Sequence, residues 1–202
     1  MKTLGVLLAG GAGTRLRTGA PKALALLAGA TLLERALSTL RACCDDVVVA
    51  APASLALPVP AAMRADDETG TAGPLAGIVA GLSARTFDRA FVLGVDFPLV
   101  RSSFLLALGE RLQGGALAVL PAPDARVQPL VAAYAPGALA PLAAALRDGR
   151  RALVPEVLAL PHELVDDAAL ARMPGGRAGL LNVNTQRDLA EAVRLLAQEG
   201  AV

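Results

Sequence analysis

The sequence contains few aromatic residues, few cysteines and no excess of either charge. Aromatic residues make up only 2% of the 202 residues, whereas 54% are hydrophobic, so the core must be built from aliphatic side chains. This hydrophobic content excludes an intrinsically disordered chain. The length suits one α/β domain, and we expect residues 1–202 to form a single domain.

The charges are nearly balanced, with 19 Lys plus Arg against 18 Asp plus Glu and a net charge of +1. Nucleic acid is not an expected partner, because binding to a phosphate backbone requires a clustered basic surface. The first residues, MKTLGVLLAGG, contain an apolar run that is too short to span a bilayer and lack a signal-peptide cleavage pattern. We therefore expect a cytoplasmic protein that has no membrane partner.

Several residue types that often carry chemistry are scarce. The two cysteines, Cys43 and Cys44, are adjacent and cannot supply a disulfide framework or a full set of zinc ligands, so we expect them to be packing residues. The single histidine, His162, and the single tyrosine, Tyr134, have no triad partners in their sequence context. We expect both to be structural or surface residues.

The chain alternates apolar runs with segments of helical periodicity. Strands are expected at 3–8, 45–51, 89–95, 116–120 and 130–134, and helices at 31–41, 73–83, 102–112, 138–147 and 189–197. Thr31 and Glu34 fit a capping box at the start of the first helix. The β-branched run at 47–49 is typical of a strand that is buried on both faces of a parallel sheet. The pattern predicts an α/β fold with a three-layer, mostly parallel sheet.

A glycine-rich segment follows the first expected strand, where open α/β sheets bind ligands. It reads Leu8-Ala9-Gly10-Gly11-Ala12-Gly13-Thr14-Arg15-Leu16, and Lys22 follows Pro21. Backbone N–H groups of glycines can approach phosphate oxygens closely, and Arg15 and Lys22 could neutralise a triphosphate. The segment lacks the Gly-Lys-Ser/Thr ending of a P-loop. Its glycine spacing also does not lead directly into a helix, as it does in a dinucleotide-binding fingerprint. A plain turn is the alternative interpretation.

Acidic residues follow two further segments of the expected sheet. Asp96 ends Leu93-Gly94-Val95-Asp96-Phe97-Pro98, where a carboxylate could hold Mg²⁺ against a nucleotide α-phosphate, or could only cap the following loop. Asp66-Asp67-Glu68 precedes the start of the second helix. For Asp67 and Glu68, contact with a ligand and stabilisation of the helix dipole remain alternatives.

Three amide side chains are candidates for binding a second substrate. Gln128 lies in a proline-containing loop, and Asn182 and Asn184 lie in Asn182-Val183-Asn184-Thr185. Amides can both donate and accept hydrogen bonds, as recognition of a polar heterocycle or a phosphate requires. Alternatively, Asn184 or Thr185 only caps the last helix.

Together these segments resemble the MobA-like nucleotidyltransferases of the molybdenum cofactor, in particular the guanylyltransferase branch. The resemblance covers nearly the whole chain and implies a Rossmann-like nucleotidyltransferase (GT-A-like) domain. It rests on these ordered motifs: Leu8-Ala9-Gly10-Gly11, Arg15, Lys22, Asp66, Gly73-Pro74-Leu75-Ala76-Gly77, Val95-Asp96-Phe97-Pro98, Gln128-Pro129-Leu130 and Asn182-Val183-Asn184-Thr185.

The resemblance implies that GMP is transferred from GTP to the terminal phosphate of molybdopterin, with or without bound molybdenum, and that pyrophosphate is released. It also implies Mg²⁺ as cofactor, bound by Asp96, together with partners that deliver molybdopterin and molybdoenzymes that receive the product. The expected catalytic residues are Arg15, Lys22 and Asp96. The expected nucleotide-binding residues are Leu8, Ala9, Gly10, Gly11, Gly13, Lys22, Asp66 and Asp96. The expected acceptor-binding residues are Gln128, Asn182 and Asn184.

Some features of the sequence depart from this family. The segment Gly13-Thr14-Arg15-Leu16 followed by Pro21-Lys22 is similar to sugar-phosphate nucleotidyltransferases, although their acceptor motifs are not found here. The family often has an asparagine after the second strand, where this chain has Ala50-Ala51-Pro52, so we expect base contacts to come partly from the backbone. Leu-Ala-Gly-Gly favours the guanylyl over the cytidylyl branch. A cytidylyltransferase, transfer to another phosphorylated metabolite and a non-catalytic nucleotide-binding protein remain alternatives.

Overall fold

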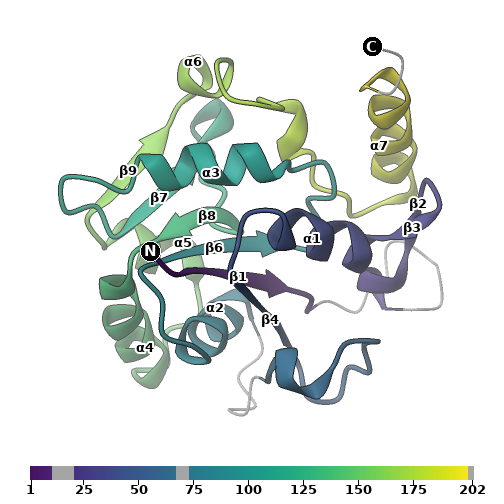
Figure 1. The fold of residues 1–202 in the computed structure, drawn as a ribbon. Helices are drawn as coiled ribbons and strands as arrows, with labels where there is room; N and C mark the ends of the chain where they lie inside the picture. The colour runs from purple at the N-terminus through teal and green to yellow at the C-terminus, as the bar shows by residue number, and fades with distance from the viewer. Residues whose placement is uncertain (11–20, 67–72, 200–202) are drawn as a thin grey trace.

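A computed structural model describes residues 1–10, 21–66 and 73–199 (Figure 1). These residues form a seven-stranded sheet with the strand order β5-β4-β1-β6-β8-β7-β9. Its strands are β1 (Thr3–Leu8), β4 (Asp46–Ala51), β5 (Arg64–Asp66), β6 (Arg89–Gly94), β7 (Ala118–Pro121), β8 (Val131–Tyr134) and β9 (His162–Val165). β8 pairs antiparallel with β6 and β7, whereas the other neighbours in this sheet pair in parallel. The expected mostly parallel sheet is thus confirmed.

Helices cover both faces of the sheet, which gives the three layers that the sequence predicts (Figure 1). One face carries α1 (Leu32–Arg41) and α3 (Ser102–Glu110), and the other carries α2 (Pro74–Ser83), α4 (Leu139–Arg147) and α5 (Leu153–Leu158). The short α6 (Asp167–Leu170) follows β9, and α7 (Gln186–Glu199) lies beside the hairpin of β2 (Leu26–Leu27) and β3 (Ala30–Thr31). Short 3₁₀ turns lie at η2 (Lys22–Leu24), η3 (Ala61–Met63), η4 (Pro123–Ala125), η5 (Pro136–Ala138) and η6 (Ala178–Leu180).

The continuous apolar run of β1 is explained by burial on both faces. Alternate side chains of a strand point to opposite faces of its sheet. Leu4, Val6 and Leu8 therefore pack in the core beneath α2 and α4, whereas Leu7 packs in the core beneath α1 and α3. Both cores are largely aliphatic, as the composition predicts.

Helix α2 packs directly against β1 at two positions where the helix has glycine. A Cβ atom at Gly81 would lie 2.2 Å from Val6 Cγ1, and one at Gly77 would lie 3.1 Å from Leu8 Cδ2. Larger residues would push the helix away from the sheet. The close approach brings the first turn of α2 to the carboxyl end of β1, at the edge of the sheet where the polar motifs gather.

The Thr31–Glu34 capping box is present, and the expected strands and helices occur with end shifts of a few residues. Tyr134 is fully buried and donates its hydroxyl to Pro129 O at 3.2 Å, consistent with a structural role. Cys43 and Cys44 are free thiols whose Sγ atoms lie 3.9 Å apart. Within the described ranges, no helix is long and apolar enough to cross a membrane.

Candidate active site

A cavity of about 360 Å³ opens at the carboxyl ends of β1, β4 and β6. These strands are parallel neighbours, so the residues that follow them meet at one edge of the sheet. The cavity is lined by Leu8, Gly10, Lys22, Ala50, Ala51, Pro52, Gly73, Pro74, Gly77, Val95, Asp96 and Leu130. The lining joins the glycine-rich segment, the end of β4, the start of α2 and the Asp96 segment, which are far apart in the sequence.

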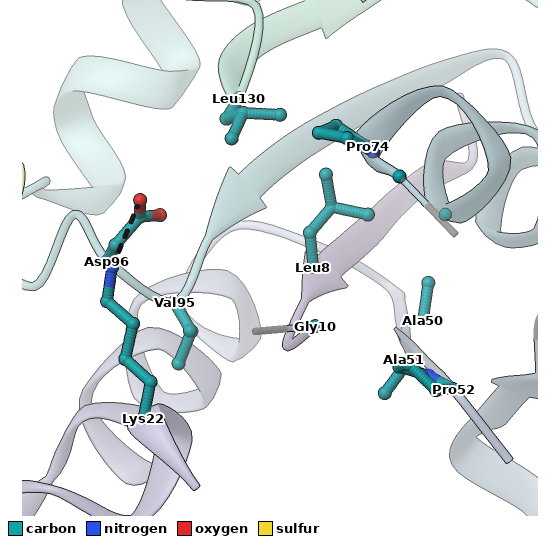
Figure 2. Close-up of a pocket in the computed structure, with 12 residues that line it drawn as sticks. Leu8, Gly10, Lys22, Ala50, Ala51, Pro52, Pro74, Val95, Asp96 and Leu130 are labelled. Carbon is teal, nitrogen blue, oxygen red and sulfur yellow. Dashed lines mark ion pairs between the residues drawn. The ribbon is translucent and has the colours of Figure 1, made fainter. Parts of the chain in front are cut away.

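The cavity has a charged end and an apolar end. Lys22 and Asp96 lie together on one side, while Ala50, Ala51 and Pro52 lie on the opposite side (Figure 2). Such an arrangement suits an elongated ligand that carries charge at one end and a flat apolar surface at the other.

Lys22 and Asp96 form an ion pair, with Lys22 Nζ 3.4 Å from Asp96 Oδ2 (Figure 2). Their side chains are only 10% and 16% exposed, respectively. Gly94 contributes to this geometry, because a Cβ atom there would lie 2.4 Å from Asp96 Oδ1. A glycine at this position therefore gives the carboxylate room beside the strand end. Sequence reasoning overlooked this role of Gly94.

The segment before α7 contacts this ion pair directly. Lys22 Nζ donates a hydrogen bond of 2.6 Å to Asn184 Oδ1, and Val183 N donates one of 2.8 Å to Asp96 O. Asn184 Nδ2 in turn donates to Asn182 Oδ1 at 2.6 Å. The two candidate asparagines and the charged pair thus form one connected network.

Capping of α7 is carried out by Thr185 and Asp188. Asp188 N donates to Thr185 Oγ1 at 3.2 Å, and Asp188 Oδ2 accepts hydrogen bonds from Thr185 N at 2.7 Å and Asn184 N at 2.9 Å. This is the reciprocal pattern of a capping box. The Asn184 side chain is therefore directed to Lys22 rather than to the helix end. Asp188 was missed in the sequence, although its spacing from Thr185 is that of a capping box.

A second cavity, of about 510 Å³, lies next to this network. It is lined by Pro123, Asp124, Arg126, Gln128, Arg177, Ala178, Leu180, Leu181, Asn182, Glu191 and Leu195. Gln128 precedes Leu130 of the first cavity by two residues, and Asn182 is hydrogen-bonded to Asn184. Gln128 and Asn182 thus line the second cavity, and Asn184 links Asn182 to Lys22 of the first cavity.

Some predicted residues cannot be placed. Gly11, Gly13, Arg15, Asp67 and Glu68 lie outside the described residues. Asp66 ends β5, and its backbone is in register with Ala51, which lines the first cavity.

Binding of Mg²⁺ at Asp96 depends on which side chains could serve as ligands. The described part of the chain contains no group of three or more His, Cys, Asp or Glu residues that could hold a metal ion. Asp96 instead presents a single carboxylate to a cavity of nucleotide size. Mg²⁺ is commonly held in this way, by one or two carboxylates together with substrate phosphates.

Solved structures with the same fold include a dinucleotide biosynthesis protein and a cytidylyltransferase. The molybdopterin-guanine dinucleotide biosynthesis protein A of Archaeoglobus fulgidus superposes with a TM-score of 0.78 at 24% identity, covering 96% of this chain and 99% of that one. The 2-C-methyl-D-erythritol 4-phosphate cytidylyltransferase of Thermus thermophilus gives a TM-score of 0.68 at 25% identity, covering 96% and 98%. The expected Rossmann-like nucleotidyltransferase fold is confirmed.

Sequence comparisons lead to the same family. A probable molybdenum cofactor guanylyltransferase of Chloroflexus aggregans is 36% identical over 196 residues, which cover 94% of this chain and 92% of the relative. The molybdenum cofactor guanylyltransferase of Desulfosudis oleivorans is 27% identical, covering 93% of both chains. The model of the MobA-like NTP transferase domain matches residues 5–165. The chain therefore belongs to the MobA-like NTP transferase family.

Proposed function

We propose that this protein transfers GMP from GTP to the terminal phosphate of molybdopterin, releasing pyrophosphate and forming the guanine dinucleotide form of the molybdenum cofactor. The observation that carries the proposal is a hydrogen-bonded connection between two cavities: Lys22 and Asp96 line the first, and Asn184 links Lys22 to Asn182, which lines the second. A transferase that joins two substrates needs two sites that meet at its charged groups. The names of the similar proteins supply the identity of the two substrates.

In this proposal the first cavity binds GTP with its phosphates toward Lys22 and its base toward Ala50, Ala51 and Pro52. The nucleotide contacts are assigned to Leu8, Ala9, Gly10, Gly11, Gly13, Lys22, Asp66 and Asp96. The charged and apolar ends of the cavity support this orientation. Because the described side chains at the apolar end carry no polar groups, hydrogen bonds to the base fall partly to the backbone.

Catalysis is assigned to Arg15, Lys22 and Asp96. Nucleotidyl transfer depends mainly on alignment of the reactants and on neutralisation of the charge that develops on the phosphates. The attacking group is a phosphate that is already ionised, so a general base is not required. Lys22 would neutralise phosphate oxygens as a point charge, and Asp96 would hold Mg²⁺, which would supply further positive charge when bound.

The acceptor is proposed to bind in the second cavity, which Gln128 and Asn182 line, and to reach Asn184, which is hydrogen-bonded to Asn182. Their amide groups can donate to and accept from the edge of a pterin or a phosphate. Asn182 would then lie beside the acceptor while Asn184 lies against Lys22.

Residues 1–202 would act as one nucleotidyltransferase domain in the cytoplasm. A molybdopterin-delivery protein and the receiving molybdoenzymes remain proposed partners.

The main competing function is nucleotidyl transfer with another base or acceptor. Two observations support this alternative. The fold is similar to that of a cytidylyltransferase that acts on a phosphorylated polyol, and the described side chains at the apolar end of the cavity include no polar group that would select guanine. A non-catalytic nucleotide-binding protein is less consistent with a carboxylate paired to a lysine inside the cavity.

The test is pyrophosphate release with each NTP in turn, in the presence of Mg²⁺ and freshly prepared molybdopterin. We expect release with GTP only, dependent on the acceptor, and loss of at least about 99% of the rate in Asp96→Ala, since one charged group at the reacting phosphates is worth about 10²-fold or more. Circular dichroism would verify that the variant is folded. A preference for CTP, or release with a sugar phosphate instead of molybdopterin, would replace the proposal by the corresponding alternative.

A further inference from the structure

We propose that Arg177 is a positioning residue that shapes the second cavity by holding the loop 123–126 in a strained conformation. The inference rests on the proposed function, because it takes this cavity as the acceptor site. It concerns residues that lie outside the Lys22–Asp96–Asn184 network. Asp124 and Arg177 both line the second cavity.

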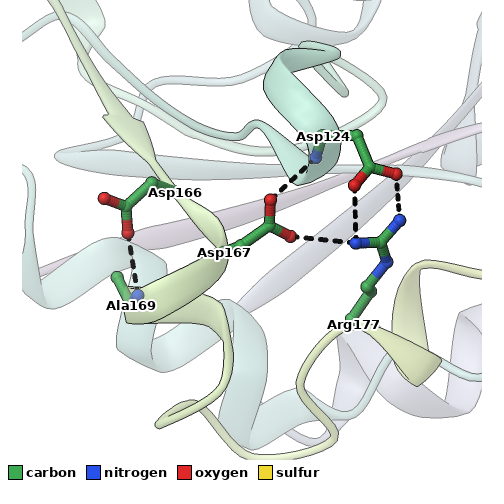
Figure 3. A network of polar contacts seen from close by, with 5 residues as sticks. All are labelled: Asp124, Asp166, Asp167, Ala169 and Arg177. Atoms are coloured by element: carbon green, nitrogen blue, oxygen red, sulfur yellow. Dashed lines mark hydrogen bonds and ion pairs between the residues drawn. The ribbon is translucent and has the colours of Figure 1, made fainter.

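Arg177 joins two walls of the second cavity that come from distant parts of the chain. Its Nη1 donates to Asp124 Oδ1 at 2.8 Å and to Asp167 Oδ1 at 3.2 Å, and its Nη2 donates to Asp124 Oδ2 (Figure 3). Asp167 Oδ2 also accepts a hydrogen bond from Asp124 N at 2.9 Å. Two carboxylates thus share one guanidinium, an arrangement that is stronger than a single exposed ion pair.

The loop that Arg177 holds is conformationally strained. Asp124 has φ 49° and ψ 36°, and the next residue, Ala125, has φ 59°. Residues other than glycine rarely adopt this left-handed region, although Asp tolerates it better than Ala does. Two consecutive residues in this conformation persist only if surrounding contacts hold them. Backbone hydrogen bonds close the turn, from Ala125 N to Ala122 O at 3.2 Å and from Arg126 N to Pro123 O at 2.9 Å. The Arg177 and Asp167 contacts to Asp124 add side-chain interactions that hold it against another part of the chain.

The strained turn determines where Gln128 lies. After the turn the chain doubles back, and Gln128 N donates to Pro121 O at 2.8 Å before β8 begins at Val131. Elsewhere in the lining of the same cavity, Arg177 leads through η6 to Asn182. One set of ion pairs therefore fixes the spacing between Gln128 and Asn182, two of the three amides assigned to the acceptor.

This arrangement predicts that Arg177 affects binding of the acceptor and leaves binding of GTP unchanged. We expect Arg177→Ala to raise the acceptor KM at least about fivefold, while the GTP KM and the kcat at saturating acceptor stay within about twofold of wild type. Arg111→Ala is the matched control. It removes another exposed ion pair, with Arg111 Nη2 2.5 Å from Glu163 Oε1, away from both cavities, and should leave all three parameters unchanged.

A rescue experiment separates positioning from direct contact. Ala125→Gly relieves part of the strain while keeping every side chain of the ion-pair cluster. If Arg177 acts through the loop, Arg177→Ala combined with Ala125→Gly should recover part of the acceptor KM. If the double variant is as impaired as Arg177→Ala alone, Arg177 contacts the acceptor directly and the inference is wrong. An unchanged acceptor KM in Arg177→Ala would also overturn it.

Hydrogen exchange of the protein without substrates tests the inference independently of the proposed function. In Arg177→Ala we expect faster exchange confined to the amides of 124–128 and 177–182, partly restored by Ala125→Gly. If wild type releases no pyrophosphate with molybdopterin, the proposed function is wrong and exchange alone decides whether Arg177 holds the loop. Unchanged exchange in Arg177→Ala would refute that role.

Discussion

Lys22 and Asn184 are 162 residues apart in the sequence, yet Lys22 Nζ donates a 2.6 Å hydrogen bond to Asn184 Oδ1. The same ammonium group lies 3.4 Å from Asp96 Oδ2. The position of this positive charge is therefore set jointly by the end of β6 and by the segment before α7. A charge that is held in place before the substrate arrives needs no reorganisation during the reaction, which is the basis of electrostatic preorganisation.

The first prediction concerns the charge itself. Lys22→Ala removes the ammonium group from the proposed triphosphate site, so kcat/KM for GTP should fall by at least about tenfold, or about 1.4 kcal/mol of transition-state stabilisation. Lys2→Ala is the control, because Lys2 is exposed and outside both cavities. Steady-state pyrophosphate release measures both variants. Wild-type kinetics in Lys22→Ala would remove Lys22 from the mechanism.

The second prediction concerns the partner of that charge. In Asn184→Ala we expect the GTP KM to rise about three- to tenfold, because Lys22 loses a fixed hydrogen-bond acceptor. Asn184→Asp keeps an oxygen for Lys22 but loses the donor to Asn182, so it should retain more of the GTP affinity.

A double-mutant cycle separates this role from a direct contact with the acceptor. If Asn184 acts through Lys22, the effects on the GTP KM of Asn184→Ala and Lys22→Ala should be strongly non-additive. Additive effects, or a change in the acceptor KM alone, would mean that Asn184 acts only through its proposed contact with the acceptor and not through Lys22.

The central part of the fold could be predicted from the sequence because burial leaves a strong local signal there. β1 and β4 are buried on both faces and therefore appear as continuous apolar runs. β5 and β9 were not predicted. They are the edge strands of the sheet, and their short, partly polar sequences lack both alternation and an apolar run.

The site could be predicted only in part, for a related reason. Lys22 and Asp96 lie in segments that follow the expected strands 3–8 and 89–95. Their proximity could therefore be predicted, because the carboxyl ends of parallel strands meet at one edge of the sheet. The contact between Lys22 and Asn184 depends on how the segment before α7 returns across the end of β6, which no local pattern records. The ion pairs of Arg177 likewise join Asp124 and Asp167 through tertiary structure alone.

The third prediction tests the close packing that brings α2 to the cavity. A Cβ atom at Gly81 would lie 2.2 Å from Val6 Cγ1, so Gly81→Ala must push α2 away from β1. We expect the free energy of unfolding to fall by about 1–3 kcal/mol, the usual cost of overpacking a core. Ser83→Ala, an exposed position on the same helix, is the control. Urea unfolding followed by circular dichroism measures both, and equal stability of the two variants would contradict the prediction.

The fourth prediction uses the pKa of Asp188, which holds the segment carrying Asn184. Partial burial raises this pKa, but hydrogen bonds from Asn184 N and from the hydroxyl and backbone of Thr185 outweigh it, so the pKa lies below its ordinary value of 3.8. A carboxyl group whose pKa is lowered by folding stabilises the native state fully above its unfolded pKa. This contribution is lost as the pH falls through the folded value.

Asp188→Asn removes the titrating group and weakens the capping box, at a cost of about 1 kcal/mol at neutral pH. The difference in the free energy of unfolding between wild type and Asp188→Asn should be constant from about pH 5 to pH 8 and should shrink below about pH 3.8, as the wild-type carboxylate takes up a proton. Urea titrations at pH 7, 5 and 3 measure this difference. A difference at pH 3 as large as that at pH 7 would mean that ionised Asp188 does not stabilise the start of α7, and Asn184 would then have to be held against Lys22 by other contacts.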